Sequence, residues 1–282
     1  MGRSTNSSAA MHPRFRAGRQ GSLFEVLFLP QDRQPRGVVL HTPPFAEELN
    51  KSRRMIAQQA RALAREGWAV LVPDCYGCGD SGGDFADGRW ELWVDDLADG
   101  LSEVMDCYPG PVTLWGLRAG CLLAVDLAER LPFSLRGVIL WQPVVNGQHF
   151  LTQFLRLRMA SGMLNGEAAE TTRALRERLE QGEPLEIAGY TLHPQLAAAL
   201  NRARLQPPAD SVLWLEVSGS SEEEGSGASL SPASQRIVQG WRSQEVRVEA
   251  QALPGEPFWA TQEIGTAPAL IEETTRWQVQ HG

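Results

Sequence analysis

The sequence predicts an α/β fold in which a mostly parallel central sheet carries helices on both faces. Four short apolar runs lie between residues 37 and 143, separated by segments of helical periodicity. The runs are almost continuously apolar, as expected for strands that are buried on both faces. The connections are short, which favours parallel strands joined by crossover helices. With 282 residues, of which 43% are hydrophobic, the chain can build one large domain of this class.

The individual elements follow from changes of hydrophobic period along the chain. The first expected helix begins at Asn50, shows apolar residues at helical spacing and ends at Gly67. The third helix stops before Pro132, which cannot continue it. The expected strands are residues 37–40, 68–74, 111–116, 136–143, 211–219 and 245–253, and the expected helices are residues 50–66, 90–108, 118–131 and 267–280.

The ends and the middle of the chain depart from this alternation. Residues 1–20 are polar and basic, and we expect a mobile tail there. Residues 146–205 carry helical patterns with no convincing strand, which predicts a helical cap inserted into the sheet domain. The predicted core is therefore made of residues 21–145 and 206–282.

Charge and composition exclude several classes of function. The net charge of −8 argues against nucleic acid as a partner. No apolar stretch is long enough for a membrane span, and the first twenty residues lack the apolar run of a secretion signal, so we expect a cytoplasmic protein. The pair Cys75-x-x-Cys78 has no second pair to complete a structural zinc site. We expect neither a metal nor a cofactor.

The segment WGLRAG, residues 115–120, stands where a strand turns into a helix. Gly116 and Gly120 occupy the outer positions of the G-x-S-x-G nucleophile elbow. The central position holds Arg118, whose guanidinium stays protonated and cannot attack a carbonyl. The frame of a nucleophile is present without the nucleophile.

This order of elements, with an elbow after the third strand of the run, resembles the α/β-hydrolase fold. A more specific set of segments is similar to the exosortase A system-associated hydrolase 2 family: HTPPFAEELNKSRRM, VPDCYGCGDSGGDF, WGLRAG, LWQPVVNGQ, FLRLRMA and GEPFW. The resemblance implies a hydrolase, and a protein partner from the exosortase, PEP-CTERM sorting and exopolysaccharide export system. Fold and family name alone do not establish an activity.

The residues of a Ser-His-Asp triad are missing from their expected places. The histidine should follow the last strand, near residues 253–260, where the chain reads LPGEPFWA. The acid position offers only Glu222, Glu223 or Glu224 in a Gly/Ser/Glu-rich loop. The standard mechanism, in which an imidazole activates a hydroxyl, is therefore excluded, because neither the hydroxyl nor the imidazole is present at its expected position.

Three other residues are candidates for catalysis. Cys121 lies one turn into the elbow helix, where a thiol near an arginine would be acidified, although buried packing is the simpler interpretation. His41 ends the first strand of the run and could act as a general base at the mouth of a pocket, or could satisfy the loop by hydrogen bonds. Glu256 lies near the vacant histidine position and could be a base or the partner of Arg118.

Arg118 itself predicts an anion-binding site. The elbow holds it above the first turn of a helix, where free N–H groups and the positive end of the helix dipole favour negative charge. Alternatively, Arg118 pairs with an acid such as Asp74 or Asp80 and closes the pocket. Other residues expected to line the site are Ala119, Trp141, Gln142 and Asp74.

Two classes of function follow. The first is a non-classical hydrolase or acyl transferase that uses His41, Glu256 or Cys121. The second is a catalytically inactive binding or scaffold protein in which Arg118 holds a small anionic or acyl ligand, or the carboxylate of a partner. The lack of a nucleophile at the elbow favours the second class, and the family resemblance favours the first.

Overall fold

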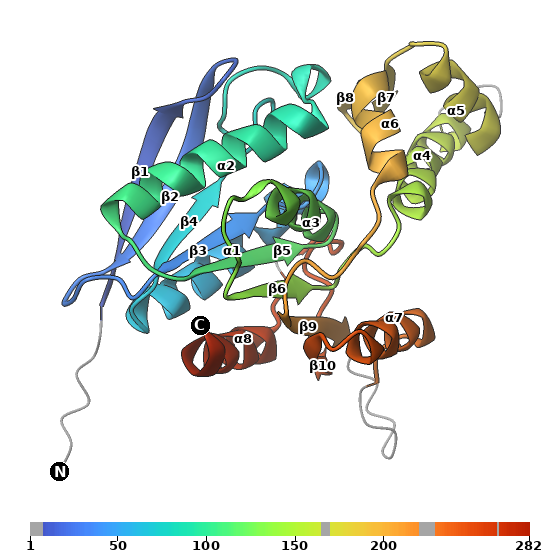
Figure 1. Ribbon diagram of the computed structural model, residues 1–282. Helices are drawn as coiled ribbons and strands as arrows, with labels where there is room; N and C mark the ends of the chain where they lie inside the picture. Colours follow the sequence, from blue (N-terminus) through green and yellow to red (C-terminus); the bar gives the residue numbers. More distant parts are fainter. Residues whose placement is uncertain (1–7, 165–169, 220–228, 264) are drawn as a thin grey trace.

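A computed structural model of the chain describes residues 8–164, 170–219, 229–263 and 265–282. Its centre is an eight-stranded sheet with the order β1-β2-β4-β3-β5-β6-β9-β10 (Figure 1). Strands β1, β2 and β4 pair antiparallel, and the pairs from β4 to β10 are parallel. The strands are β1 Ala9–Ala17, β2 Ser22–Pro30, β3 Val38–Thr42, β4 Ala69–Pro73, β5 Val112–Leu117, β6 Gly137–Trp141, β9 Ser211–Ser218 and β10 Arg247–Pro254.

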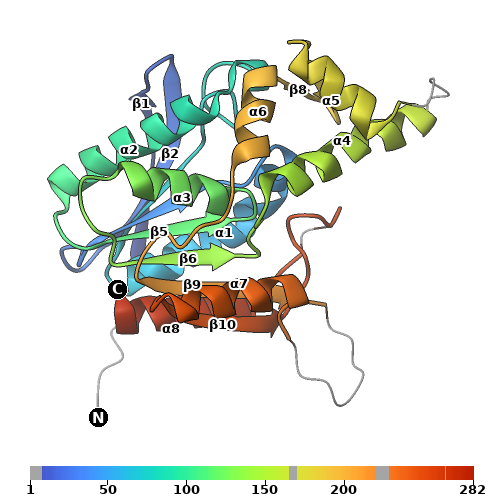
Figure 2. The ribbon, with the colours of Figure 1, turned by 45° about the vertical axis from the view of Figure 1, so that its right-hand side comes forward.

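Helices cover both faces of this sheet (Figure 1 and Figure 2). One face packs against α1 Glu47–Arg65 and α8 Pro268–His281, and the other against α2 Trp90–Cys107, α3 Gly120–Arg130 and α7 Pro232–Ser243. A short 3₁₀ turn, η1 Phe85–Asp87, precedes α2. Side chains alternate along each buried strand, so that Leu114 enters the core under α2 and α3 while Trp115 enters the core under α1 and α8. The predicted α/β architecture is confirmed.

The first strand corrects the expectation of a mobile tail over residues 1–20. Residues 9–17 form β1, which pairs with β2 along its whole length, and residues 1–7 lie outside the described ranges. Basic residues that indicated a solvated tail form ion pairs in the structure. Glu25 on β2 is fully buried and accepts hydrogen bonds from Arg14 at 2.7 Å and from Arg16 at 3.3 Å. A buried carboxylate is tolerated when it is paired in this way.

The segment between β6 and β9 forms a separate layer, which we call the insertion (Figure 1). It contains α4 Gly147–Leu164, α5 Thr172–Glu180, β7 Leu185–Ile187, β8 Tyr190–Leu192 and α6 Pro194–Arg202. The expectation of helices without strands is wrong at β7 and β8, which form a hairpin. Its two turn residues, Ala188 and Gly189, both have positive φ, as a two-residue hairpin turn requires. Ala-Gly lacks the Asn-Gly or Asp-Gly signal by which such turns are found in sequences.

Figures 1 and 2 both place the insertion on the side of the molecule away from the C-terminus, beside the elbow end of β5. Aromatic rings join the insertion to the sheet domain, because Phe45 contacts Phe150 and Phe154 on α4 with ring centroids 5.8 and 5.2 Å apart. Within the described ranges, no helix combines the length and apolar character needed to cross a lipid bilayer.

Candidate functional site

The turn between β5 and α3 has the geometry of an elbow with an arginine at its tip. Arg118 has a φ of 55°, a left-handed conformation that costs a non-glycine residue on the order of 1–2 kcal/mol. The Arg118 N–H donates to the Trp141 carbonyl at 3.0 Å, and its own carbonyl accepts from the Val144 N–H at 3.2 Å. A Cβ on Gly120 would lie 2.2 Å from the Thr42 carbonyl oxygen, so the tight turn requires glycine there. The strained turn is kept although the nucleophile is absent.

The Arg118 side chain lies between one carboxylate and two aromatic rings. Its Nε donates to Oε1 of Glu48 at 3.1 Å. Its guanidinium carbon is 5.9 Å from the ring centroid of Phe150 and 5.6 Å from that of Trp259, both within the range of cation–π attraction. The side chain is 19% exposed, and its two terminal nitrogens have no partner among the described residues. The end of the guanidinium fork is therefore available to a ligand.

Glu48, in the first turn of α1, is the acid that Arg118 contacts. This corrects the expected pairing with Asp74 or Asp80: Asp74 pairs with Arg53 at 2.8 Å and accepts the Asp80 N–H at 3.0 Å. Asp74 therefore belongs to the glycine-rich loop after β4 and does not line the site.

The surroundings of Glu48 disfavour its charged form. Its side chain is 20% exposed, and its Oε2 is buried without a hydrogen-bond partner in the described structure. Burial raises the pKa of the Glu48 carboxyl, and the nearby Arg118 offsets this only in part. A glutamate in the first turn of a helix is ordinarily a favourable charge, so its place in the sequence does not indicate this contact.

A cavity of about 200 Å³ opens in front of this ion pair, and we call it the elbow pocket. The loop after β3 and the start of α1 form one wall, and α4 of the insertion forms the other. Its lining residues are Phe45, Ala46, Glu47, Glu48, Arg118, Phe150, Gln153, Phe154 and Leu157. The pocket therefore combines apolar walls with a guanidinium–carboxylate pair. Such a combination fits a ligand that has an apolar body and one polar end.

His41 is not at the mouth of a pocket, contrary to expectation. The side chain is 0% exposed, its ring lies 4.4 Å from the ring of Trp115, and its Nδ1 is 3.0 Å from the Trp115 carbonyl oxygen. Burial lowers the pKa of His41 to about 3. The imidazole is therefore neutral and enclosed, which excludes it as a general base for a ligand in the elbow pocket.

Cys121 and Glu256 also lie away from the chemistry predicted for them. Cys121 is fully buried with Sγ 3.7 Å from the Trp141 carbonyl oxygen, and burial raises the pKa of its thiol well above the usual range. Glu256 is exposed and accepts the Thr266 N–H at 3.1 Å, which fixes its own loop. Neither contacts the elbow pocket.

The same loop brings Trp259 to the site instead of Glu256. It follows β10, where the histidine of a triad would be expected, and it places an indole ring over Arg118. Trp259 is 7% exposed and packs on Phe258. The sequence predicts Glu256 of the segment GEPFW as a base or as the partner of Arg118, whereas in the structure Trp259 of this segment contacts the guanidinium. Only the structure separates the two.

The remaining predicted site residues support the elbow from behind. Trp141 is fully buried, and its Nε1–H donates to Thr274 at 2.8 Å. Gln142 accepts the Val217 N–H at 2.8 Å through its side chain, which holds the end of β9. Ala119 is buried at the start of α3. The predicted acids Glu222, Glu223 and Glu224 lie outside the described residues.

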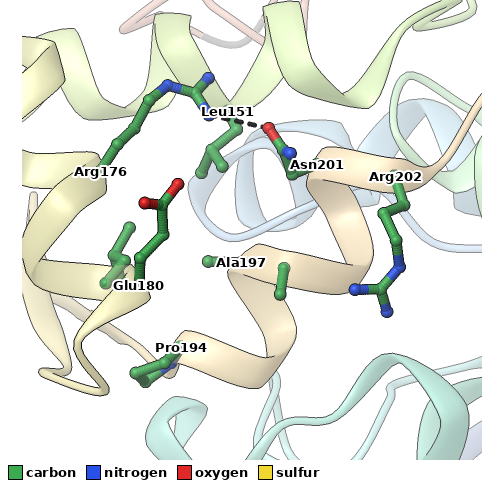
Figure 3. A pocket seen from close by; sticks show the side chains of 9 residues that line it. Leu151, Arg176, Glu180, Pro194, Ala197, Asn201 and Arg202 are labelled. Carbon is green, nitrogen blue, oxygen red and sulfur yellow. Dashed lines mark hydrogen bonds between the residues drawn. The ribbon is translucent and has the colours of Figure 1, made fainter.

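A second hollow of about 160 Å³ lies within the insertion (Figure 3). Arg176 of α5 reaches across it and donates to Asn201 at 2.7 Å, to the Gln148 carbonyl at 2.9 Å and to Thr152 at 2.6 Å. This arginine ties α4, α5 and α6 together, so three of its five N–H donors are already used. The hollow is a seam between helices rather than a built ligand site.

The chain was compared with known proteins. Residues 33–197 match the family described as serine aminopeptidase, S33. No curated protein sequence matches. Among solved structures, Est1E from Butyrivibrio proteoclasticus with bound ferulic acid is 16% identical, has a TM-score of 0.66, and is aligned over 95% of this chain and 98% of that one.

Two further structures give the same result. A thermostable carboxyl esterase from Bacillus coagulans, in complex with glycerol, is 15% identical with a TM-score of 0.59, over 96% of this chain and 97% of that chain. XC6422 from Xanthomonas campestris, described as an α/β serine hydrolase without a lid, is 15% identical with a TM-score of 0.54, over 98% and 93% of the two chains. These likenesses concern the fold.

Proposed function

We propose that this chain, which belongs to the serine aminopeptidase S33 family and has the α/β-hydrolase fold, is a ligand-binding protein that does not use a Ser-His-Asp triad. Arg118 occupies the position of the nucleophile, and the loop that would carry the histidine supplies Trp259. None of the candidates His41, Cys121 and Glu256 contacts the elbow pocket. The absence of these three reactive groups from the lining of the elbow pocket therefore supports ligand binding rather than acyl transfer.

The observation that carries this proposal is the open end of the Arg118 guanidinium in the elbow pocket. Its Nε is held by Glu48, and two rings restrict the plane of the fork, while the terminal nitrogens remain free to donate. A carboxylate matches such a fork with two parallel hydrogen bonds. The start of α3, directly after Arg118, adds the positive end of a helix dipole. An anionic ligand is the best match for this arrangement.

The apolar walls indicate what the rest of the ligand is. Phe150 and Phe154 of α4 face the loop after β3 across the pocket, so the insertion acts as a cap over the ligand. An engineered apolar cavity of about 150 Å³ holds benzene, and the elbow pocket of about 200 Å³ has room for one ring or a short acyl chain. Ferulic acid, present in the Est1E structure, is a ligand of this kind.

A non-classical hydrolase or acyl transferase is the alternative, supported by the family and by the esterases among the similar structures. With the expected catalytic residues away from the pocket, this alternative depends on Glu48 as a base that activates water. A carboxyl with a raised pKa in a pocket has the properties of such a base.

The cellular role is inferred from the motif resemblance alone. The segments shared with the exosortase A-associated hydrolases support a cytoplasmic protein that serves PEP-CTERM sorting or exopolysaccharide export, with a protein partner from that system. The net charge of −8 supports a role without nucleic acid.

The test combines binding and turnover in the same preparation. We expect octanoate to raise the melting temperature of the wild type and not of Arg118→Ala, while nitrophenyl esters and acyl thioesters are not hydrolysed above buffer. Glu256→Gln is a matched control that removes a charge outside the pocket and should respond like the wild type. Turnover that Glu48→Gln abolishes would establish the hydrolase alternative instead.

A further inference from the structure

We propose that the elbow pocket takes up an apolar-tailed monocarboxylic acid together with one proton, so that Glu48 is a neutral acid whenever a ligand carboxylate occupies the pocket. The inference rests on the proposed function, because it requires that Arg118 binds a ligand carboxylate. It adds the class of ligand and a dependence of binding on pH.

The charges of the residues that line the pocket explain why a proton is taken up with the ligand. Among its lining residues, Arg118 is the one cation, and Glu47 and Glu48 are the acids. Glu48 already accepts a hydrogen bond from Nε of Arg118 at 3.1 Å. A ligand carboxylate that binds the terminal nitrogens of Arg118 would therefore share one guanidinium with the Glu48 carboxylate. Two carboxylates sharing a site disfavour each other's charge, and one of them then keeps a proton. Proton uptake removes this repulsion.

Glu48 rather than Glu47 is placed to receive the proton. The Oε2 atom of Glu48 is buried and has no donor among the described residues, so charge on it is poorly stabilised. When protonated, the carboxyl becomes a donor that can serve a ligand oxygen beside Arg118. Glu47 is exposed, and its Oε2 accepts from Tyr190 Oη at 2.9 Å and from the Asn50 amide at 3.2 Å. Those hydrogen bonds already occupy one carboxylate oxygen of Glu47.

The other groups around Glu48 do not replace it as the proton acceptor. Lys51, on the same helix, favours a charged Glu48, but its Nζ donates to the Ala260 carbonyl at 3.2 Å. Cys121, behind the elbow, and Tyr190, on the hairpin of the insertion, stay neutral near pH 7 because burial raises the pKa of each. The α4 residues of the pocket, Phe150, Gln153, Phe154 and Leu157, have no titratable group.

The lining selects the ligand class. Phosphate and sulfate monoesters bring more oxygens than the single open fork can pair, and the rest of the wall is mainly phenylalanine, leucine and alanine. Burial of an unpaired anionic oxygen against such a wall is unfavourable. A carboxylic acid presents two oxygens to the fork and its tail to the rings.

The experiment is titration of octanoate into the full chain by calorimetry at pH 5.5, 6.5 and 7.5. Octanoate is ionised throughout this range, because a carboxyl pKa lies near about 4–5. We expect uptake of one proton, seen as a dependence of the measured heat on the ionisation enthalpy of the buffer. We also expect the Kd to rise up to about tenfold per pH unit above the pKa of Glu48.

Two variants and two probes make the result specific. Glu48→Gln keeps an oxygen for Arg118 Nε and offers an amide donor, so it should bind octanoate at least about tenfold more tightly at pH 7.5 and show no pH dependence. Glu47→Gln should keep the slope of the wild type. Octanamide, with the same tail and no charge, should bind without proton uptake. Octyl sulfate should bind at least about tenfold more weakly than octanoate at pH 5.5.

The outcomes separate this inference from the proposed function. Octanoate binding that needs Arg118 but shows no proton uptake and equal affinity at all three pH values would refute the inference and leave the proposed function standing. Tight binding of octyl sulfate would refute the ligand class. Failure of both the wild type and Glu48→Gln to bind octanoate at any of these pH values would refute the proposed function and the inference together.

Discussion

The buried imidazole of His41 makes the fold sensitive to acid, by an amount that the structure allows us to calculate. Burial lowers the pKa of His41 to about 3 in the folded chain, against an ordinary value of 6.5. The unfolded state therefore binds the proton first, so stability is complete above pH 6.5 and is lost as the pH falls below that value. At pH 5 the loss is about 1.5 pH units at 1.36 kcal/mol each, or about 2 kcal/mol.

The assay is urea unfolding at pH 7.5 and pH 5.0, for the wild type and for His41→Leu. The variant loses the hydrogen bond to the Trp115 carbonyl, so its stability at pH 7.5 is expected to fall. The informative quantity is the loss in free energy of unfolding between pH 7.5 and pH 5.0. This loss should be smaller in the variant than in the wild type by about 2 kcal/mol. His149→Gln, on an exposed position of α4, is the matched control and should keep the difference seen in the wild type. An equal pH difference in His41→Leu would refute the assignment of a buried neutral imidazole.

Three further predictions concern stability. Gly120→Ala should lose more than about 3 kcal/mol or fail to fold, because its Cβ meets backbone at 2.2 Å, whereas Gly240→Ala on α7 meets nothing within 4 Å and should be neutral or stabilising by urea unfolding. Glu25→Ala should cost about 3–5 kcal/mol, since it leaves two arginines without their buried partner; a loss below 1 kcal/mol would contradict this pairing. Trp259→Ala should cost about 3 kcal/mol in urea and weaken octanoate binding, and unchanged binding would show that the indole does not position Arg118.

Most of the sheet could be predicted because its strands are buried on both faces. All six predicted strands form, with bounds shifted by a few residues at most. Five of them are almost continuously apolar runs, and the sixth, residues 245–253, is predicted by its alternation and is only partly buried. Strand β2 is not among the predicted strands. Strand β1 could not be found in this way. It is an edge strand with exposed side chains, and the pairing of its arginines with Glu25 depends on a neighbouring strand.

The tip of the elbow could be predicted, but the partners of its side chain could not. The position of Arg118 follows from two glycines and the strand-to-helix order. Its contacts with Glu48 and Trp259 depend on how far two loops reach over the ends of β3 and β10, and local sequence does not determine this reach. From the sequence alone Asp74 is an equally reasonable partner, and its pairing with Arg53 is evident only in the structure. The burial of His41 could not be predicted either. The strand continues past residue 40 to Thr42, and this turns the His41 side chain into the core.

Arg118 at the tip of the elbow and Trp259 after β10 are physically linked. An arginine at the elbow tip beside an imidazole would place two potential cations together, whereas an indole at that place attracts the guanidinium through its ring face. Glu48 then neutralises the arginine from the opposite loop at 3.1 Å. Arg118→Ser alone would therefore leave the Glu48 carboxylate without its cation in a mainly apolar pocket. The loops from β3, β5 and β10 meet at the elbow, and the groups they bring together match the anionic ligand that we propose for the elbow pocket.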